Sequence, residues 1–209
     1  MQKLFIFLLF TTFTSCAQNT EKKKRDPRVT ELTKSIIPLV YHLENPDSCL
    51  KALSYLDSAT ALDSNCFLCY QNKIMFLNNL KQYDKIIIAN NNLIRIAPNA
   101  HDLYMTGGIY YEKVGDAENS KKYFKKSLSI CNIVLDTMNR KHRDYVMFTI
   151  NKATDLIMLE DQKQAKEILK DLYDSEPDDP EWDNIVKKEI LSLMDKNKSQ
   201  IMEHYFTHK

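Results

Sequence analysis

The stretch that decides the fold covers residues 101–134 and reads HDLYMTGGIYYEKVGDAENSKKYFKKSLSICNIV. In its first half, Tyr104, two adjacent glycines and Tyr111 are spaced so that they share one face of a helix. Small residues on that face allow a second helix to approach closely. The pattern breaks at Gly115, and small and apolar residues within 120–128 then form the facing side. The stretch therefore predicts two helices joined by a tight turn.

The pattern resembles one tetratricopeptide repeat (TPR), a helical hairpin that recurs every 34 residues. The matching positions are Tyr104, Gly107, Gly108, Tyr111, Ser120, Phe124 and Ser127. Shifting the frame by 34 residues finds further copies at 33–66 and 67–100. A fourth copy lies at 146–179, after an eleven-residue insertion at 135–145. The resemblance implies an all-α fold: a right-handed α-solenoid of about four TPR hairpins with a C-terminal capping helix.

The amino terminus has the pattern of an export signal. Lys3 precedes a short apolar run that is too short to span a membrane but is typical of a signal peptide. Residues 13–16, FTSC, resemble a bacterial lipobox, although Phe13 stands where Leu is usual. The resemblance implies cleavage before Cys16 and attachment of several acyl chains, which would anchor the chain stably. An ordinary signal peptide with an incidental cysteine is the alternative.

The segment after Cys16 is polar and has no apolar period, so it predicts a flexible tether. The alternative is that its basic residues contact the anionic headgroups of membrane lipids. Ala17 stands where Asp would favour retention at the inner membrane, and by resemblance to sorted lipoproteins we expect the outer membrane of a bacterial cell envelope. The predicted divisions are a signal peptide at 1–15, a tether at 16–28, the repeat array at 29–179, and a capping helix and tail at 180–209.

Composition is consistent with this organisation and argues against other classes. The chain has only three glycines and six prolines in 209 residues, which is little turn material for a β-fold. Its 29 basic and 28 acidic residues are balanced, so no bulk field attracts nucleic acid. His204 and His208 lie four residues apart without a third ligand, and no catalytic triad, carboxylate pair or phosphate loop fits the repeats. We therefore expect a non-enzyme without cofactor or metal.

One motif with reactive residue types is Cys66-Phe67-Leu68-Cys69. It lies at the predicted start of a helix, where the helix dipole lowers the pKa of a thiol. Thiol oxidoreductases place such a motif after a strand, and no strand pattern precedes it here. Packed thiols, a structural disulfide between Cys66 and Cys69, and redox activity remain the three alternatives.

Two function classes follow. The first is an interaction scaffold that binds a peptide or another protein in the concave groove of the array; the second is a thiol-active envelope protein that uses Cys66 and Cys69. In TPR proteins, set positions of the first helix of each hairpin line the groove. The resemblance therefore implies these candidate partner-binding residues: Tyr41, Gln71, Asn72, Met75, Asn79, Met105, Ile109, Lys113, Ile150 and Asn151. The methionines and isoleucines are expected to form an adaptable apolar stripe, with the amides available to a peptide backbone. Burial of part of this stripe by the terminal helix or by the long hairpin is the alternative.

Overall fold

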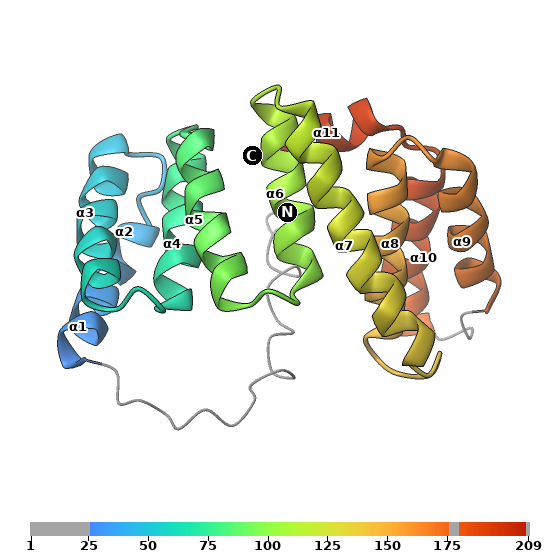
Figure 1. The fold of residues 1–209 in the computed structure, drawn as a ribbon, viewed down its shortest axis with the longest axis horizontal. Helices are drawn as coiled ribbons and strands as arrows, with labels where there is room; N and C mark the ends of the chain where they lie inside the picture. The colour runs from blue at the N-terminus through green and yellow to red at the C-terminus, as the bar shows by residue number, and fades with distance from the viewer. Residues whose placement is uncertain (1–25, 176–179, 208–209) are drawn as a thin grey trace.

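The computed structural model describes residues 26–175 and 180–207, and within them it contains helices and no strand. Successive helices lie side by side in a curved row (Figure 1). The predicted all-α solenoid is therefore confirmed. Its helices are α1 (Pro27–Ser35), α2 (Ile37–Val40), α3 (Pro46–Leu62), α4 (Phe67–Asn79), α5 (Tyr83–Ile96), α6 (His101–Lys113), α7 (Ala117–Thr137), α8 (Tyr145–Met158), α9 (Gln162–Ser175), α10 (Pro180–Met194) and α11 (Lys198–Thr207).

Three of the hairpins share one turn conformation. Lys81, Gly115 and Glu160 each have a positive φ, of 55°, 83° and 66°, directly after the C-cap residue of the first helix of their hairpin. In each turn the next residue donates its N–H five residues back, the bond that defines a Schellman helix end. These bonds are Gln82 to Leu77 (3.0 Å), Asp116 to Tyr111 (2.9 Å) and Asp161 to Leu156 (2.8 Å). The repeat therefore recurs in the backbone even where the sequence lacks glycine.

The hairpin that carries the decisive sequence is packed as expected. Phe124 is fully buried, and a Cβ atom on Gly108 would lie only 2.9 Å from its ring. Ser120 and Ser127 are buried on the same side of α7. The small residues of α6 thus allow the close approach that the pattern predicted. Helix α7 continues to Thr137, so it extends beyond the 34-residue unit into the insertion.

The first hairpin departs from the regular pattern. Helix α1 already begins at Pro27, because Asp26 accepts a hydrogen bond from the Arg28 N–H and caps it. Two residues assigned to the tether therefore lie in the first helix. The helix stops at Ser35, and the four-residue α2 carries Pro38 in its first turn. Proline has no N–H for a continuous helical ladder, which explains the break.

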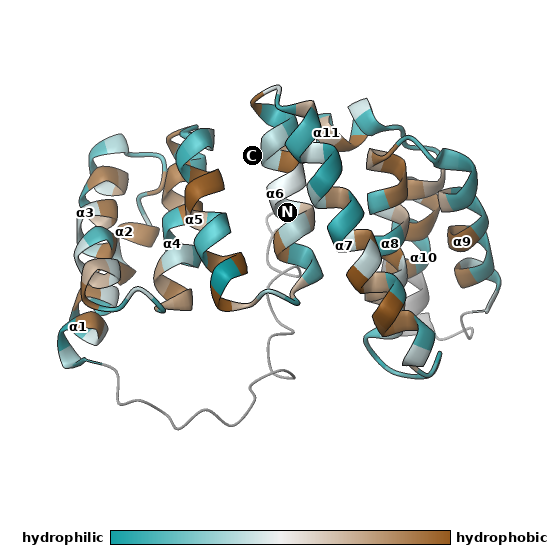
Figure 2. Ribbon diagram, in the orientation of Figure 1, coloured by the Kyte–Doolittle hydropathy of each residue, from teal (hydrophilic) through white to brown (hydrophobic). Residues whose placement is uncertain are grey.

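The core is divided along the array, as expected when each hairpin contacts only its neighbours. Three buried apolar clusters are centred on α3 with α4, on α5 with α6, and on α8 with α9. Figure 2 shows hydrophobic and hydrophilic segments on the same helices, consistent with one buried stripe per helix. The array therefore leaves one face of most helices open to solvent.

Within 180–207 the carboxyl terminus forms two helices, α10 and α11. Helix α11 covers residues 198–207, inside the predicted capping helix and tail. Asn197 and Gln200 exchange hydrogen bonds at 2.9 and 3.0 Å, a reciprocal cap that starts the helix. Ile201 is buried in the same cluster as Ile190 of α10 and Leu156 of α8. The chain thus turns back from α10 onto the repeats.

Candidate partner-binding surface

The predicted partner-binding residues of the first two repeats lie at the surface. Tyr41 follows α2 and is 77% exposed, and Gln71, Asn72, Met75 and Asn79 on α4 are half-buried. Met75 packs against the same buried cluster as Leu39 and Val40 of α2, so α4 and the first hairpin share one part of the core. Ile37 and Leu68, at neighbouring positions of the same helices, are 57% and 47% exposed. We call Ile37, Tyr41, Leu68, Gln71, Asn72 and Met75 the N-terminal surface.

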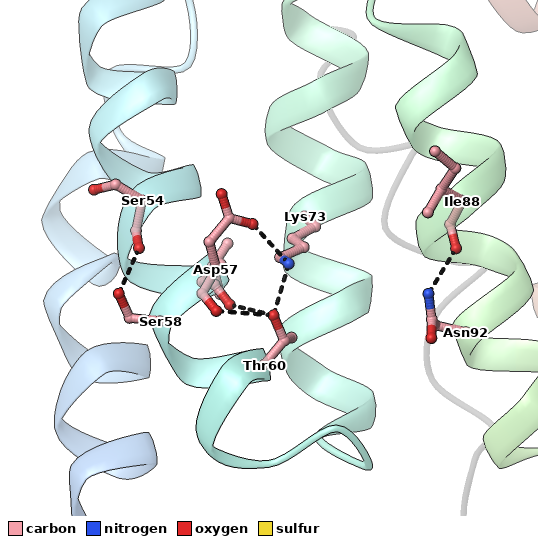
Figure 3. A network of polar contacts seen from close by, with 8 residues as sticks. Ser54, Asp57, Ser58, Thr60, Lys73, Ile88 and Asn92 are labelled. Carbon is pink, nitrogen blue, oxygen red and sulfur yellow. Dashed lines mark hydrogen bonds and ion pairs between the residues drawn. The ribbon is translucent and has the colours of Figure 1, made fainter.

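A polar network holds the helices beneath this surface. Lys73 of α4 forms an ion pair with Asp57 of α3 at 2.7 Å and donates a hydrogen bond to the Thr60 hydroxyl, also at 2.7 Å (Figure 3). The Lys73 side chain is only 14% exposed, whereas the Asp57 side chain is 72% exposed, so solvent screens the ion pair from the Asp57 side. The network holds α4 against α3 and thereby fixes the orientation of α4, the helix that carries Gln71, Asn72 and Met75.

The predicted residues of the last two repeats are placed differently. Met105, Ile109, Ile150 and Asn151 are all buried. The three apolar side chains belong to one cluster with Ile190 of α10 and Ile201 of α11. Asn151 Nδ2 lies 2.9 Å from His101 Nε2. Buried side chains cannot contact a partner in this conformation, and we therefore leave these four out of the proposed surface.

Lys113 remains exposed, but Phe206 of the same chain covers part of the groove beside it. Its Nζ lies 4.5 Å from the ring centre of Phe206 in α11 and 5.7 Å from that of Tyr83. A cation over an aromatic ring is a stabilising contact. Sequence reasoning did not identify Phe206 as a groove residue. The spacing of Ile201, Tyr205 and Phe206 was the only signal that the tail continues as a helix.

Buried polar groups gather between α6, α7 and α8. Burial raises the pKa of Asp155 to about 8, and the nearby Ser127 hydroxyl only partly opposes this. Burial also raises the pKa of Asp102 and lowers the pKa of His101 to about 4. The pKa of the Cys131 thiol rises because of burial and then because of the Asp155 carboxylate. All four shifts favour the uncharged form, as expected inside a packed core.

The two cysteines of the CxxC motif form a disulfide in the structure. Both residues are fully buried, and Cys66 is the N-cap of α4. The bond therefore closes the start of the helix that presents Gln71, Asn72 and Met75. Cys49 and Cys131 are buried free thiols on α3 and α7.

The described residues include no group of three His, Cys, Asp or Glu side chains that is arranged to hold a metal ion. His208 and the predicted lipid site Cys16 lie outside the described residues. Within 26–175 and 180–207, no helix is both long enough and apolar enough to span a bilayer.

The basic turn after α7 is held by ion pairs, since Arg140 contacts Asp171 at 2.7 Å and Arg143 contacts Asp144 at 3.3 Å.

The geometry defines a class of protein: an all-α solenoid built from TPR-like hairpins. Comparison with solved structures agrees with this class. Nearly identical TPR-like repeats assigned to a kinesin light chain of Podosopora anserina superpose with a TM-score of 0.51 at 10% identity, covering 87% of this chain and 99% of theirs. A single-substitution variant of those repeats gives a TM-score of 0.52 with the same identity and coverage. At this identity the likeness shows the fold alone.

No protein-family model matches the chain, and no curated protein matches it in sequence.

Proposed function

We propose that this chain is a non-catalytic interaction scaffold that is anchored in a bacterial envelope and binds a peptide or a partner protein through its N-terminal surface. The observation that carries the proposal is the exposure of large apolar side chains beside half-buried amides on the first two repeats. Tyr41 and Ile37 are 77% and 57% exposed, and Gln71 and Asn72 lie on the neighbouring first helix. Exposed apolar residues next to hydrogen-bonding groups are typical of peptide-binding surfaces.

The kind of partner follows from these side chains. Met75 is unbranched and adapts to differently shaped apolar groups. The amides of Gln71 and Asn72 each offer donors and an acceptor, which suits the backbone of an extended segment. An exposed aromatic such as Tyr41 supplies a large contact area at a small entropic cost. An extended peptide with apolar anchor residues therefore fits the surface best.

A catalytic role for the thiols has little geometric support. Reactive cysteines are partly exposed and have a lowered pKa. Cys66 and Cys69 are instead fully buried and joined to each other, and burial raises the pKa of Cys49 and Cys131. These properties favour the scaffold over the thiol-active alternative.

Charge on the N-terminal surface tests the binding proposal. Ile37→Glu combined with Tyr41→Glu should lower partner capture at least tenfold, because two apolar anchors would be replaced by solvated carboxylates. Both side chains are mostly exposed, so the helical circular dichroism signal should not change. Ile88→Glu is the matched control, because Ile88 is 63% exposed on α5, a second helix of a hairpin. Equal capture by the double variant and the control would contradict the proposal.

Anchoring is a separate part of the proposal and rests on the lipobox-like residues 13–16. Cys16→Ala should move the protein from the detergent phase to the aqueous phase in Triton X-114 partitioning, since the acyl chains supply the membrane affinity. Mass spectrometry of the mature amino terminus should find lipid on Cys16 in the wild type. An unmodified terminus produced by cleavage at another position would overturn the lipid anchor and leave the binding proposal untouched.

The tether sets how far the array lies from the bilayer. Ten residues, 17–26, separate Cys16 from the first helix. Even fully extended, they reach about 36 Å at most. Anchored in this way, the array would work close to the membrane surface.

A further inference from the structure

Helix α11 returns across the repeats instead of continuing the solenoid. It follows α10 after the short link 195–197, and Figure 1 shows it running back toward α6. Its first residue, Lys198, forms an ion pair with Glu112 at the end of α6, with the Nζ and Oε1 atoms 2.8 Å apart. Both side chains are largely shielded, at 28% and 21% exposure. The pair is therefore stronger than a typical surface salt bridge.

The other end of α11 inserts an aromatic ring between two repeats. The ring of Phe206 lies 5.5 Å from that of Tyr83 and 5.8 Å from that of Tyr110, with an interplanar angle of 72° in both cases. This edge-to-face geometry is the favourable one for aromatic pairs. The Phe206 ring also contacts Lys113, whose Nζ lies 4.5 Å from the ring centre. Two repeats thus supply one aromatic site.

The ends of α11 are connected by a helix that is weak by itself. Ten residues are fewer than the roughly 12–15 that an isolated helix needs in water. Among its residues only Ile201 is buried, and Tyr205 remains 37% exposed. Met202 and Phe206 also pack against the buried clusters of the array, so the order of α11 depends on its contacts with α5, α6 and α8.

We propose that α11 is an internal competitor for a second binding surface, formed by Tyr83, Tyr110, Glu112 and Lys113. We define these four residues as the latch surface. Its partner is a short helix of another protein that carries a basic residue about two turns before an aromatic anchor, as Lys198 precedes Phe206 in α11. Displacement of α11 by such a helix would open the surface.

The chemistry of the latch surface supports this partner. Two tyrosine rings and a lysine ammonium surround the aromatic anchor. The second carboxylate oxygen of Glu112 is buried and has no hydrogen-bond partner among the described residues. An arginine in the place of Lys198 could satisfy both oxygens through its two parallel N–H donors, which lysine cannot do. A partner with arginine at this position is therefore expected to bind more tightly than α11 itself.

The latch surface is distinct from the N-terminal surface, so this proposal does not rest on the proposed function. The probe is a fluorescent peptide with the sequence of residues 196–209, titrated into the full chain and followed by anisotropy. Wild type should bind it weakly, because the tethered α11 occupies the site and reduces the binding-competent fraction. Phe206→Ala in the protein should tighten binding of this peptide, which keeps its own phenylalanine, at least tenfold. Glu203→Ala, an exposed change in the same helix, should leave binding as in the wild type.

A second variant locates the site. Glu112→Gln keeps the shape of the side chain but removes the charge that pairs with Lys198, so Phe206→Ala with Glu112→Gln should lose most of the gain in affinity. Hydrogen exchange should show faster exchange of the α11 amides in Phe206→Ala and unchanged protection in α6 and α8. Binding that does not tighten in Phe206→Ala, or a gain that survives Glu112→Gln, would overturn the proposal. Lost protection throughout α6–α8 would overturn it too, because α11 would then be an integral part of the fold.

Discussion

Replacing Gly108 with valine is expected to lower the free energy of unfolding by about 2–3 kcal/mol, within the range observed for overpacked cores. A Cβ atom at this position would lie 2.9 Å from two atoms of the Phe124 ring. Phe124 is fully buried and cannot move aside, so the added side chain must push α6 and α7 apart. Valine is a better helix former than glycine, but that gain of a few tenths of a kcal/mol is too small to offset the clash.

The test is a double-mutant cycle with Phe124→Leu, measured by urea denaturation. Removing the aromatic ring makes room for the valine, so Gly108→Val should cost at least about 1 kcal/mol less in the Phe124→Leu background. Additive effects of the two substitutions would show that the glycine is not needed for the approach of these two helices.

Asp155→Asn is expected to stabilise the protein above neutral pH and to reduce the dependence of its stability on pH. Asp155 is fully buried on α8, and neither carboxylate oxygen has a hydrogen-bond partner within the described part of the chain. Burial raises the pKa to about 8, against 3.8 for an ordinary Asp. Ionisation of this group in the core is therefore unfavourable.

The sign of the pH effect follows from proton binding. Between pH 3.8 and about 8, the folded state keeps the proton on Asp155 and the unfolded state releases it. Stability therefore falls as pH rises through this range, by up to about 1.4 kcal/mol per pH unit for one group. Asparagine carries no proton to release, so the variant should lack this slope.

The choice of pH range separates the effect of Asp155 from those of His101 and Cys131. The lowered pKa of His101 affects stability only below about pH 6.5, and the raised pKa of Cys131 acts only above about pH 9. Thermal unfolding of both proteins should therefore be compared between pH 6.5 and 8. The melting temperature of the wild type should fall by several degrees relative to Asp155→Asn. Parallel curves for the two proteins would contradict the buried, protonated state of Asp155.

The repeats could be predicted from the sequence because their signal is local and recurs. Gly107, Gly108 and Phe124 define one hairpin, and the 34-residue period carries that pattern to the others. The turns were less visible. Only Gly115 indicates a left-handed residue, whereas Lys81 and Glu160 adopt the same conformation without glycine. Helix packing on both sides of those turns determines a conformation that residue preference disfavours.

The candidate site was harder to predict because its exposure depends on distant contacts. Position within a hairpin indicates which side chains face the groove, and this rule selected Tyr41 and Met105 alike. Tyr41 is exposed, whereas Met105 is buried in a cluster that includes Ile190 and Ile201. These contacts join residues more than eighty positions apart, and no local pattern encodes them. Phe206 was missed for the same reason, since its partners lie in α5 and α6.

The central claim is that the N-terminal surface binds a partner, and photo-crosslinking in cells tests it most directly. A photoreactive amino acid would replace Tyr41 in one strain and Ile88 in another. Both side chains are exposed, but Tyr41 directly follows α2 in the first half of its hairpin, whereas Ile88 lies on α5, the second helix of its hairpin. We predict one discrete crosslinked partner from position 41, lost when Gln71→Glu and Asn72→Asp are added, and none from position 88. A partner crosslinked from position 88 and not from position 41 would contradict the claim.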